Sequence, residues 1–307
     1  MAAITPALIK ELRERTQAGM ADCKAALTEA DGSIDAAVEI ILKKGIVKAA
    51  NRAGRVATEG EIRTFVTADA STSFIVEINC QTDFVARGDE FKNFVTNVME
   101  VAKTAADGVD LNTLDYPGAG KSVDAVRNEL IAKTGENTVV RRWQRVAASS
   151  ADAIVHSYVH PGSKLAVLIE VSAPTGKKGA PEFLKFVDEC SMQIAAMNPI
   201  VVSKNDLSQS DIDRQREIFT AQLKEEGKPE ASWPKIVEGK VAKWYTEVTL
   251  LGQDAVIEPG ATIDKQREAL GKVLGGDVTV HRFVRFSLGE GIEKKSDDLA
   301  AEVAKLM

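Results

Sequence analysis

Residues 115–122, DYPGAGKS, come nearest to a catalytic motif in residue type and spacing. Gly120-Lys121-Ser122 resembles the end of a phosphate-binding loop, which needs Gly-x-x-x-x-Gly-Lys-Ser/Thr so that backbone amides surround a phosphate. The position of the first glycine is Asp115, whose negative charge would repel a phosphate. We therefore expect a turn in which Ser122 caps the next helix. Nucleotide hydrolysis at this segment stays open only as the weakest of the possible functions.

The three histidines form no recognisable catalytic or metal-binding pattern. His156 and His160 lie four residues apart in a strand and turn context, whereas a His-Glu-x-x-His zinc site requires a helix. A Ser-His-Asp triad stays open as an alternative, although no Gly-x-Ser-x-Gly segment supports it. His156 and His281 fit structural positions in strands. His160 precedes Pro161-Gly162 and fits an exposed hairpin tip, where it is either solvated or in contact with a partner.

The third candidate is QTDFVARGDEF, residues 81–91, which joins a strand-like run to a helix-like run. Such connections are normally polar, yet this one places Phe84 and Val85 beside Asp83. Phe84 either folds back onto its own sheet or projects, together with Asp83, into a partner. An acid beside a rigid aromatic can fill a pocket and act electrostatically on a metal or a phosphate.

The composition favours a protein partner or a small ligand over nucleic acid or lipid. The 307 residues carry a net charge of −6, so no global attraction draws the chain to nucleic acid or to an anionic membrane. Aromatic residues make up 5%, too few for extended base-stacking surfaces. We expect no direct nucleic-acid binding, no metal and no cofactor.

The cysteines and the apolar runs bear on the compartment. Cys23, Cys80 and Cys190 are odd in number and far apart, which is typical of a reducing compartment without a disulfide framework. The N-terminus MAAITPALIK lacks the apolar region of a secretory signal, and no run approaches the roughly 18 apolar residues of a membrane span. The prediction is a cytoplasmic protein without a membrane partner.

The N-terminal segment, residues 1–55, predicts a three-helix docking domain followed by a linker. Pro6 opens the first helix, and the residues after Ser33 form the third, which Gly45 is expected to close. The basic, Ala- and Gly-rich stretch 48–60 is interpreted as the linker because its apolar periodicity is weak.

The rest of the chain contains an internal duplication. Residues 62–79 match residues 155–172 without a gap at an offset of 93, and Glu77 falls on Glu170. Residues 122–146 match residues 262–286 at an offset of 140, with seven identities. The identical pairs are Asp124/Asp264, Arg127/Arg267, Leu130/Leu270, Gly135/Gly275, Val140/Val280, Arg142/Arg282 and Arg145/Arg285.

The sequence pattern of each copy predicts a hairpin, two helices and a strand. These elements would form an α+β subdomain, with a three-stranded antiparallel sheet covered by the helices on one face. The first spans residues 56–147, and the second spans residues 148–204 and 250–288. EFKNFV (90–95) matches EFLKFV (182–187) at an offset of 92, and because the offset then grows to 140, the second copy holds 48 extra residues. These predict an inserted antiparallel helical hairpin, residues 205–249, with a coiled-coil-like contact. A C-terminal helical module, residues 289–307, completes the chain.

The duplication provides two internal controls. The run Arg141-Arg142-x-x-Arg145 recurs as Arg282 and Arg285, which favours structural arginines on the solvent face of a strand over a nucleic-acid patch. QTDFVARGD aligns with APTGKKGA, residues 173–180, so the scaffold closes the same connection without an aromatic. Phe84 is therefore not required by the architecture.

Five segments in series together carry a family resemblance. They are ELRERTQAGMADCKAAL (11–27), CQTDFVAR (80–87), TGEN (134–137), SYVH (157–160) and GEGIEKK (289–295). The chain resembles, over its whole length, the elongation factor Ts family, the guanine-nucleotide exchange factors of elongation factor Tu. An exchange factor needs no catalytic residue, only a higher affinity for the nucleotide-free partner.

The resemblance implies a role for particular residues. The N-terminal domain, ubiquitin-associated-like in the family, would contact the nucleotide-binding domain of elongation factor Tu through Leu12, Arg13 and Met20. Asp83 and Phe84, flanked by Thr82 and Val85, would enter beside the magnesium and phosphate site and release GDP. His160 would meet the side of the phosphate-binding loop. The terminal helix, with Leu299 and Val303, would return to the nucleotide-binding domain.

The resemblance also implies that the second subdomain touches the distal barrel domain of the partner. The helical hairpin forms oligomers in some members, so a homodimer through it is a further expectation. Three positions depart from the family pattern: Ala21 and Thr134 replace apolar residues, and Pro161-Gly162 changes the tip after His160. The alternative function is a docking or chaperone-like adaptor without exchange activity.

Overall fold

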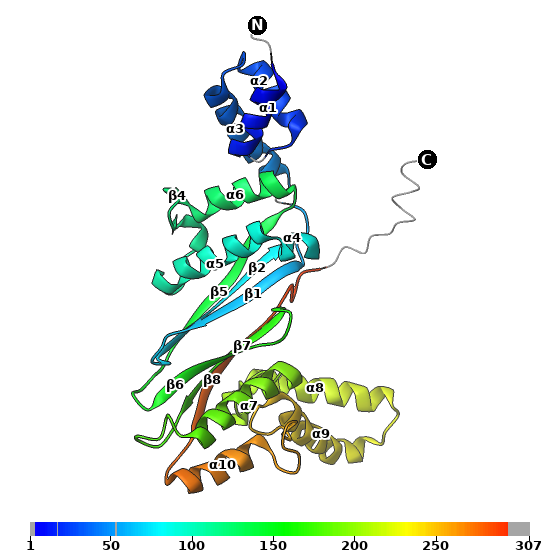
Figure 1. Ribbon diagram of the computed structural model, residues 1–307. Coiled ribbons are helices and arrows are strands. Elements are labelled where there is room, and N and C mark those ends of the chain that lie inside the picture. The colour runs from blue at the N-terminus through cyan, green and yellow to red at the C-terminus, as the bar shows by residue number, and fades with distance from the viewer. Residues whose placement is uncertain (1–3, 17, 53, 294–307) are drawn as a thin grey trace. The chain divides into compact units, whose positions relative to one another are not determined.

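The computed structural model describes residues 4–16, 18–52 and 54–293 (Figure 1). Those residues divide into two compact units. The first holds the N-terminal helices, most of the first sheet and the segment from Ser287 onward; the second holds residues 64–75 and 145–286. The architecture is α+β with antiparallel sheets, as the sequence predicted.

Three helices form the N-terminal part: α1 (Pro6–Thr16), α2 (Met20–Glu29) and α3 (Ile34–Arg52). Asp31 and Gly32 both take positive φ values, 48° and 86°, which turn the chain between α2 and α3. The Ser33 hydroxyl accepts a hydrogen bond from Ala36 N at 3.3 Å, as the capping pattern predicted. The side chains buried between the helices are those of Leu12, Cys23, Ala26, Leu27 and Ala37.

The prediction that the third helix ends at Gly45 was wrong. Helix α3 continues through Gly45 to Arg52, so the first part of the expected linker, residues 48–52, is helical. A glycine inside a helix costs about 1 kcal/mol, and the Lys- and Ala-rich residues that follow favour helix enough to offset it. The far end also has a tertiary contact, because Arg52 Nη1 donates to Ile131 O at 3.3 Å.

The first sheet has the order β1-β2-β5, with β1 (Glu59–Val66), β2 (Thr72–Cys80) and β5 (Thr138–Ala147). The central strand β2 is buried along almost its whole length. Helices α5 (Asp89–Thr104) and α6 (Val123–Thr134) run beside this sheet in Figure 1. The buried apolar side chains of α5 recur at helical spacing and include Phe91, Phe94, Val95, Val98 and Met99.

A small substructure that the sequence did not predict precedes α6. A 3₁₀ turn (Leu111–Thr113) leads into a two-stranded ladder of β3 (Asp115–Tyr116) and β4 (Lys121–Ser122). The Tyr116 ring stacks on Phe94 with centroids 5.9 Å apart, which holds the ladder against α5.

The second sheet repeats this plan with the order β6-β7-β8. Strands β6 (Ala153–Val159) and β7 (Leu165–Ser172) pair antiparallel, and β8 (Thr279–Ser287) completes the sheet. Helices α7 (Pro181–Met197) and α10 (Ile263–Leu274) belong to this subdomain. One apolar cluster joins the strands to both helices through Ile169, Val171, Phe183, Ile194 and Ile263.

Two helices occupy the extra residues of the second copy, namely α8 (Gln209–Glu225) and α9 (Trp233–Val248). A short 3₁₀ turn (Lys204–Asp206) precedes the two helices. The connection between them contains Gly227, with φ 66°, and a second 3₁₀ turn (Glu230–Ser232). The buried contact between the helices consists of Leu223, Val237 and Val241, with Phe219, Trp233, Ile236 and Tyr245 packed around it.

Two further sequence expectations concern the ends and the surroundings of the chain. The C-terminal helix expected over residues 293–307 lies, apart from its first residue, outside the described residues. Within the part of the chain that the structure describes, none of the helices combines the length and apolar character needed to cross a bilayer.

Candidate partner-binding site

The connection after β2 contains a short helix, α4 (Asp83–Arg87). Thr82 is its N-cap: the backbone is extended, and the Thr82 hydroxyl accepts from Val85 N at 3.4 Å. Gly88 N donates to Val85 O at 3.0 Å and ends the helix, and α5 begins immediately after it. One short turn of helix is therefore held between β2 and α5.

Phe84 projects from α4 into solvent. Its side chain is 84% exposed, so it does not fold back onto its own sheet. Asp83 precedes it and forms an ion pair with Arg87 Nη2 at 2.9 Å. Exposed pairs four residues apart in a helix contribute only about 0.3–0.5 kcal/mol, so this pair holds the Asp83 carboxylate weakly. Val85, the other apolar residue of the loop, is half-buried.

The turn after α6 anchors this loop from the other side. The Glu136 carboxylate accepts from Thr82 N at 3.0 Å and from Thr82 Oγ1 at 2.8 Å. Asn137 N donates to Gln81 Oε1 at 2.8 Å, and Asn137 itself is buried. Gly135, with φ 80°, ends α6 and turns the chain so that both contacts form. Sequence reasoning missed Glu136, which is 54 residues away from Thr82 in the chain.

Cys80, at the end of β2, is not a reactive group. Its thiol donates to Thr82 O at 3.2 Å. Burial, together with the negative charges of Glu136 and Glu59, raises the pKa of the thiol to about 12. A thiol with this pKa remains protonated at neutral pH and serves as a packing residue.

The N-terminal helices separate the three residues proposed there. Arg13 lies exposed on α1, and Met20 is 62% exposed at the start of α2. Leu12 is 0% exposed and belongs to the core of the three helices. The expectation that Leu12 contacts a partner is therefore corrected: its side chain holds the helices together and presents no surface.

His160 lies at the tip of the β6–β7 hairpin, as the sequence predicted, and its side chain is exposed. Its backbone N donates to Leu165 O at 2.9 Å, and Gly162 and Ser163 both take positive φ values. The Tyr158 hydroxyl lies 2.9 Å from His160 Nδ1. The ring is thus oriented by a neighbour while it stays accessible to solvent.

The Gly-Lys-Ser segment serves structural roles, as expected. Lys121 Nζ pairs with Glu129 at 2.5 Å, and the Ser122 hydroxyl accepts from Ala125 N at 3.2 Å as the N-cap of α6. Thr262 caps α10 in the same way in the second copy, accepting from Lys265 N at 3.3 Å. Each hydroxyl is engaged by a helix N-terminus, so the segment is explained by capping.

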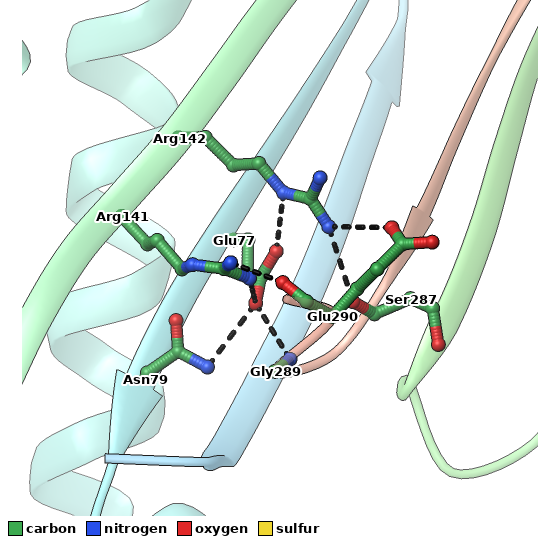
Figure 2. Close-up of polar contacts among 7 residues, drawn as sticks. All are labelled: Glu77, Asn79, Arg141, Arg142, Ser287, Gly289 and Glu290. Carbon is green, nitrogen blue, oxygen red and sulfur yellow. Dashed lines mark hydrogen bonds and ion pairs between the residues drawn. The ribbon is translucent and has the colours of Figure 1, made fainter. Parts of the chain in front are cut away.

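Of the three β5 arginines expected on the solvent face, Arg145 is exposed, but the prediction was wrong for Arg141 and Arg142. Arg141 and Arg142 do not simply face solvent: they bind the fully buried carboxylate of Glu77, at 2.9 Å and 2.6 Å (Figure 2). Gly289 N donates to the same carboxylate at 2.8 Å, and Arg142 also reaches Glu290 at 3.3 Å. The GEG segment at 289–291 is therefore attached to the first sheet by charge.

Glu77 has the electrostatics of a buried anion with enough partners. Burial alone would raise its pKa, but the hydrogen bonds from Gly289, Arg141 and Arg142 outweigh burial and lower the pKa from its ordinary value. Glu170 repeats the arrangement with fewer donors: Ser149 N at 2.5 Å and Arg282 Nε at 2.7 Å. The sequence signal for both was an isolated acid in an apolar strand, aligned across the copies with an aligned arginine.

Comparison with known proteins identifies the family. A family model described as "Elongation factor TS" matches residues 81–290. Proteins named "Elongation factor Ts" from Clostridium perfringens (strain SM101 / Type A) and Clostridium botulinum (strain Alaska E43 / Type E3) are each 43% identical to the chain, over 99% and 97% of both sequences. The chain belongs to the elongation factor Ts family. It is accordingly a translation elongation factor, of the family that generally serves elongation factor Tu in nucleotide exchange.

The positions that depart from the expected elongation factor Ts pattern have clear environments. Ala21 is exposed near the start of α2, beside Met20. Thr134 is half-buried; its hydroxyl donates to Leu130 O at 2.9 Å and accepts from Glu136 N at 3.3 Å. Thr134 therefore supports the turn that carries Glu136.

Proposed function

We propose that this chain is a cytoplasmic guanine-nucleotide exchange factor that binds elongation factor Tu and promotes GDP release during translation elongation. Asp83 and Phe84 carry the activity by entering beside the magnesium and phosphate site of the partner. No bond is made or broken by the factor. Its effect comes from binding the nucleotide-free partner more tightly than the GDP-bound partner. The chain weakens GDP binding to the partner by a certain ratio, and GDP weakens binding of the chain by the same ratio.

The 84% exposure of Phe84 at the head of an anchored helical turn supports this proposal most strongly. Leaving a phenylalanine in water forgoes about 1.5–3 kcal/mol of burial free energy, which a partner pocket would supply. The flanking Asp83 brings a negative charge whose internal ion pair is weak. Next to a magnesium ion and phosphates, such a charge competes with phosphate for the metal and repels the phosphate oxygens.

Other surfaces extend the proposed contact. Arg13 and Met20 are exposed on the N-terminal helices, and an exposed methionine adapts well to an apolar pocket. His160 is accessible at its hairpin tip. We place contacts to the nucleotide-binding domain of the partner at these residues and at Thr82 and Val85. Leu299 and Val303, proposed for the same domain, lie outside the described residues.

The second subdomain is proposed to touch the distal barrel domain of elongation factor Tu. The helical hairpin α8–α9 is proposed as a route to a homodimer. The second candidate function, a docking adaptor without exchange activity, shares the exposed N-terminal surface but assigns no role to Phe84.

The deciding experiment uses elongation factor Tu loaded with a fluorescent GDP analogue and excess unlabelled GDP. Catalytic amounts of the chain are expected to accelerate loss of the label with multiple turnovers. Complex formation without acceleration would favour the adaptor. Tight nucleotide binding by the chain alone would favour the hydrolase alternative at Gly120-Lys121-Ser122.

A further inference from the structure

We propose that Glu136 is a positioning residue for nucleotide exchange: its carboxylate fixes the N-cap of α4 and so holds Phe84 in the orientation that enters the partner. This inference rests on the proposed function. Glu136 touches neither Phe84 nor Asp83 in the described contacts, and its effect passes through Thr82.

The hydrogen-bond geometry gives Thr82 one orientation. Its hydroxyl donates to Glu136 Oε1 at 2.8 Å, and the second carboxylate oxygen accepts from Thr82 N at 3.0 Å. Because the hydroxyl proton points to the carboxylate, the oxygen lone pairs are left for Val85 N, which donates at 3.4 Å. A carboxylate is the side chain that can accept both bonds at once, since a glutamine would present a donor to one of them.

The cap matters more here than in a longer helix. Helix α4 has five residues, so intrahelical bonds are few and Ala86 N, bonded to Thr82 O at 3.2 Å, again depends on the placement of Thr82. Short helices are marginal in water without such support. Loss of the anchor is expected to leave α4 fraying and Phe84 distributed over many orientations, which raises the entropy cost of docking it.

The second copy provides a comparison within the same chain. Gly276 follows the αL glycine of α10 where Glu136 follows that of α6. A Cβ added at Gly276 would lie 3.0 Å from Pro174 Cβ, so this junction is closed by direct packing. The copy without an exposed aromatic in its loop has a glycine, Gly276, in place of Glu136, and the carboxylate of its turn, Asp277, lies one residue later and is exposed. The scaffold therefore does not require Glu136 for its own closure.

The test measures GDP release from labelled elongation factor Tu by the full chain with Glu136→Gln, Phe84→Ala and the double substitution. Glu136→Gln keeps the side-chain volume but loses one acceptor, and we expect kcat/KM for exchange to fall about tenfold, as for one charge-assisted hydrogen bond. On the Phe84→Ala background the same change is expected to cost less than about twofold, because the two residues act as one unit. Glu129→Gln, a glutamate on the preceding helix α6 and away from the loop, is the matched control and should leave exchange unchanged.

Amide hydrogen exchange in the free protein supplies a readout of positioning. The amides of Val85 and Ala86 should lose protection in Glu136→Gln, while those of β2 and α5 keep theirs. Thr82→Val, which removes the hydroxyl and keeps the shape, should reproduce both effects if the glutamine variant folds poorly.

The outcomes separate this inference from the proposed function. If Phe84→Ala slows exchange but Glu136→Gln and Thr82→Val do not, positioning by Glu136 is wrong and the proposed function stands. A loss that adds fully to that of Phe84→Ala would show that Glu136 contacts the partner directly, which also overturns the inference. If Phe84→Ala leaves exchange unchanged, the proposed function itself fails.

Discussion

Apart from the inserted hairpin, the two copies of the core differ where the central strand passes into the helix that follows. In the first copy this connection is the capped turn of α4, which presents Phe84 to solvent. In the second it is the stretch 173–180, which has no helix and exposes two lysines, Lys177 and Lys178. The same sheet and helix are thus joined in two ways, and only one of them exposes a large apolar side chain. The second connection closes without a large exposed apolar side chain, so the shared scaffold does not require Phe84.

The buried acids show the opposite relation. Glu77 and Glu170 occupy equivalent positions, each is almost wholly buried, and each pairs with an arginine from the last strand of its copy. The first copy adds Arg141 and the Gly289 amide, which attach the GEG segment. We therefore interpret a feature that both copies retain as a requirement of the scaffold. A feature that only one copy has is a candidate for function.

The largest expected effect sharpens the comparison of the acids. Glu77→Gln should destabilise the protein by about 3 kcal/mol, because two arginines lose the anion that they share in a buried site. Glu170→Gln should cost about 1–2 kcal/mol, because it leaves one arginine that is half exposed to solvent. Urea denaturation followed by tryptophan fluorescence measures both, and Trp143 on β5 reports on the first sheet. Equal costs would show that the additional donors around Glu77 contribute nothing to stability.

Acid should act on the same two carboxylates. The pKa of Glu77 and that of Glu170 are both lowered in the folded protein, by hydrogen bonds that outweigh burial. Their stabilisation is therefore fully present above the unfolded pKa, near 4.5, and is lost as the pH falls through the lower folded pKa. We expect the free energy of unfolding to fall below about pH 4.5, with a shallower decline in Glu77→Gln. An identical pH profile in wild type and variant would contradict this assignment.

A smaller effect tests the packed junction of the second copy. Gly276→Ala places a methyl group 3.0 Å from Pro174 Cβ, which is closer than van der Waals contact. The overpacking should cost about 1 kcal/mol, partly offset by the reduced entropy of the unfolded chain. Thermal denaturation measures the loss, and the exchange rate should not change. Slowed exchange in this variant would mean that the second junction also positions a contact.

The sequence predicted the duplication, the two sheets and the exposed His160 tip, because these depend on local periodicity and on turn residues. It also contained the signals of α4, since Thr82 is a good cap, Asp83 follows it and Arg87 lies in the last turn. The length of α3 was missed because its far end is stabilised by a contact with Ile131, not by a local pattern.

The sequence could not predict which residues pair with the buried charges, because these contacts also join distant segments. Strand alternation predicted that Arg141 and Arg142 face solvent. In the structure they bind Glu77 of the neighbouring strand and Glu290 of the distant GEG segment. Glu136 and Thr82 meet only after the chain has folded, so no spacing rule connects them. Leu12, taken from the family resemblance as a contact, is a core residue, which helical periodicity alone favoured.

The exchange rate of Phe84→Ala, measured by stopped-flow release of labelled GDP from elongation factor Tu, tests most directly whether Phe84 drives GDP release. We expect a loss in kcat/KM of roughly 30-fold, as for one anchoring aromatic in an interface, with a melting temperature within about 2 °C of wild type. Val273→Ala, which trims another strongly exposed apolar side chain in the second copy, should match wild type in both measurements. An unchanged exchange rate with a melting temperature lowered by many degrees would show that Phe84 stabilises the fold and does not act in exchange.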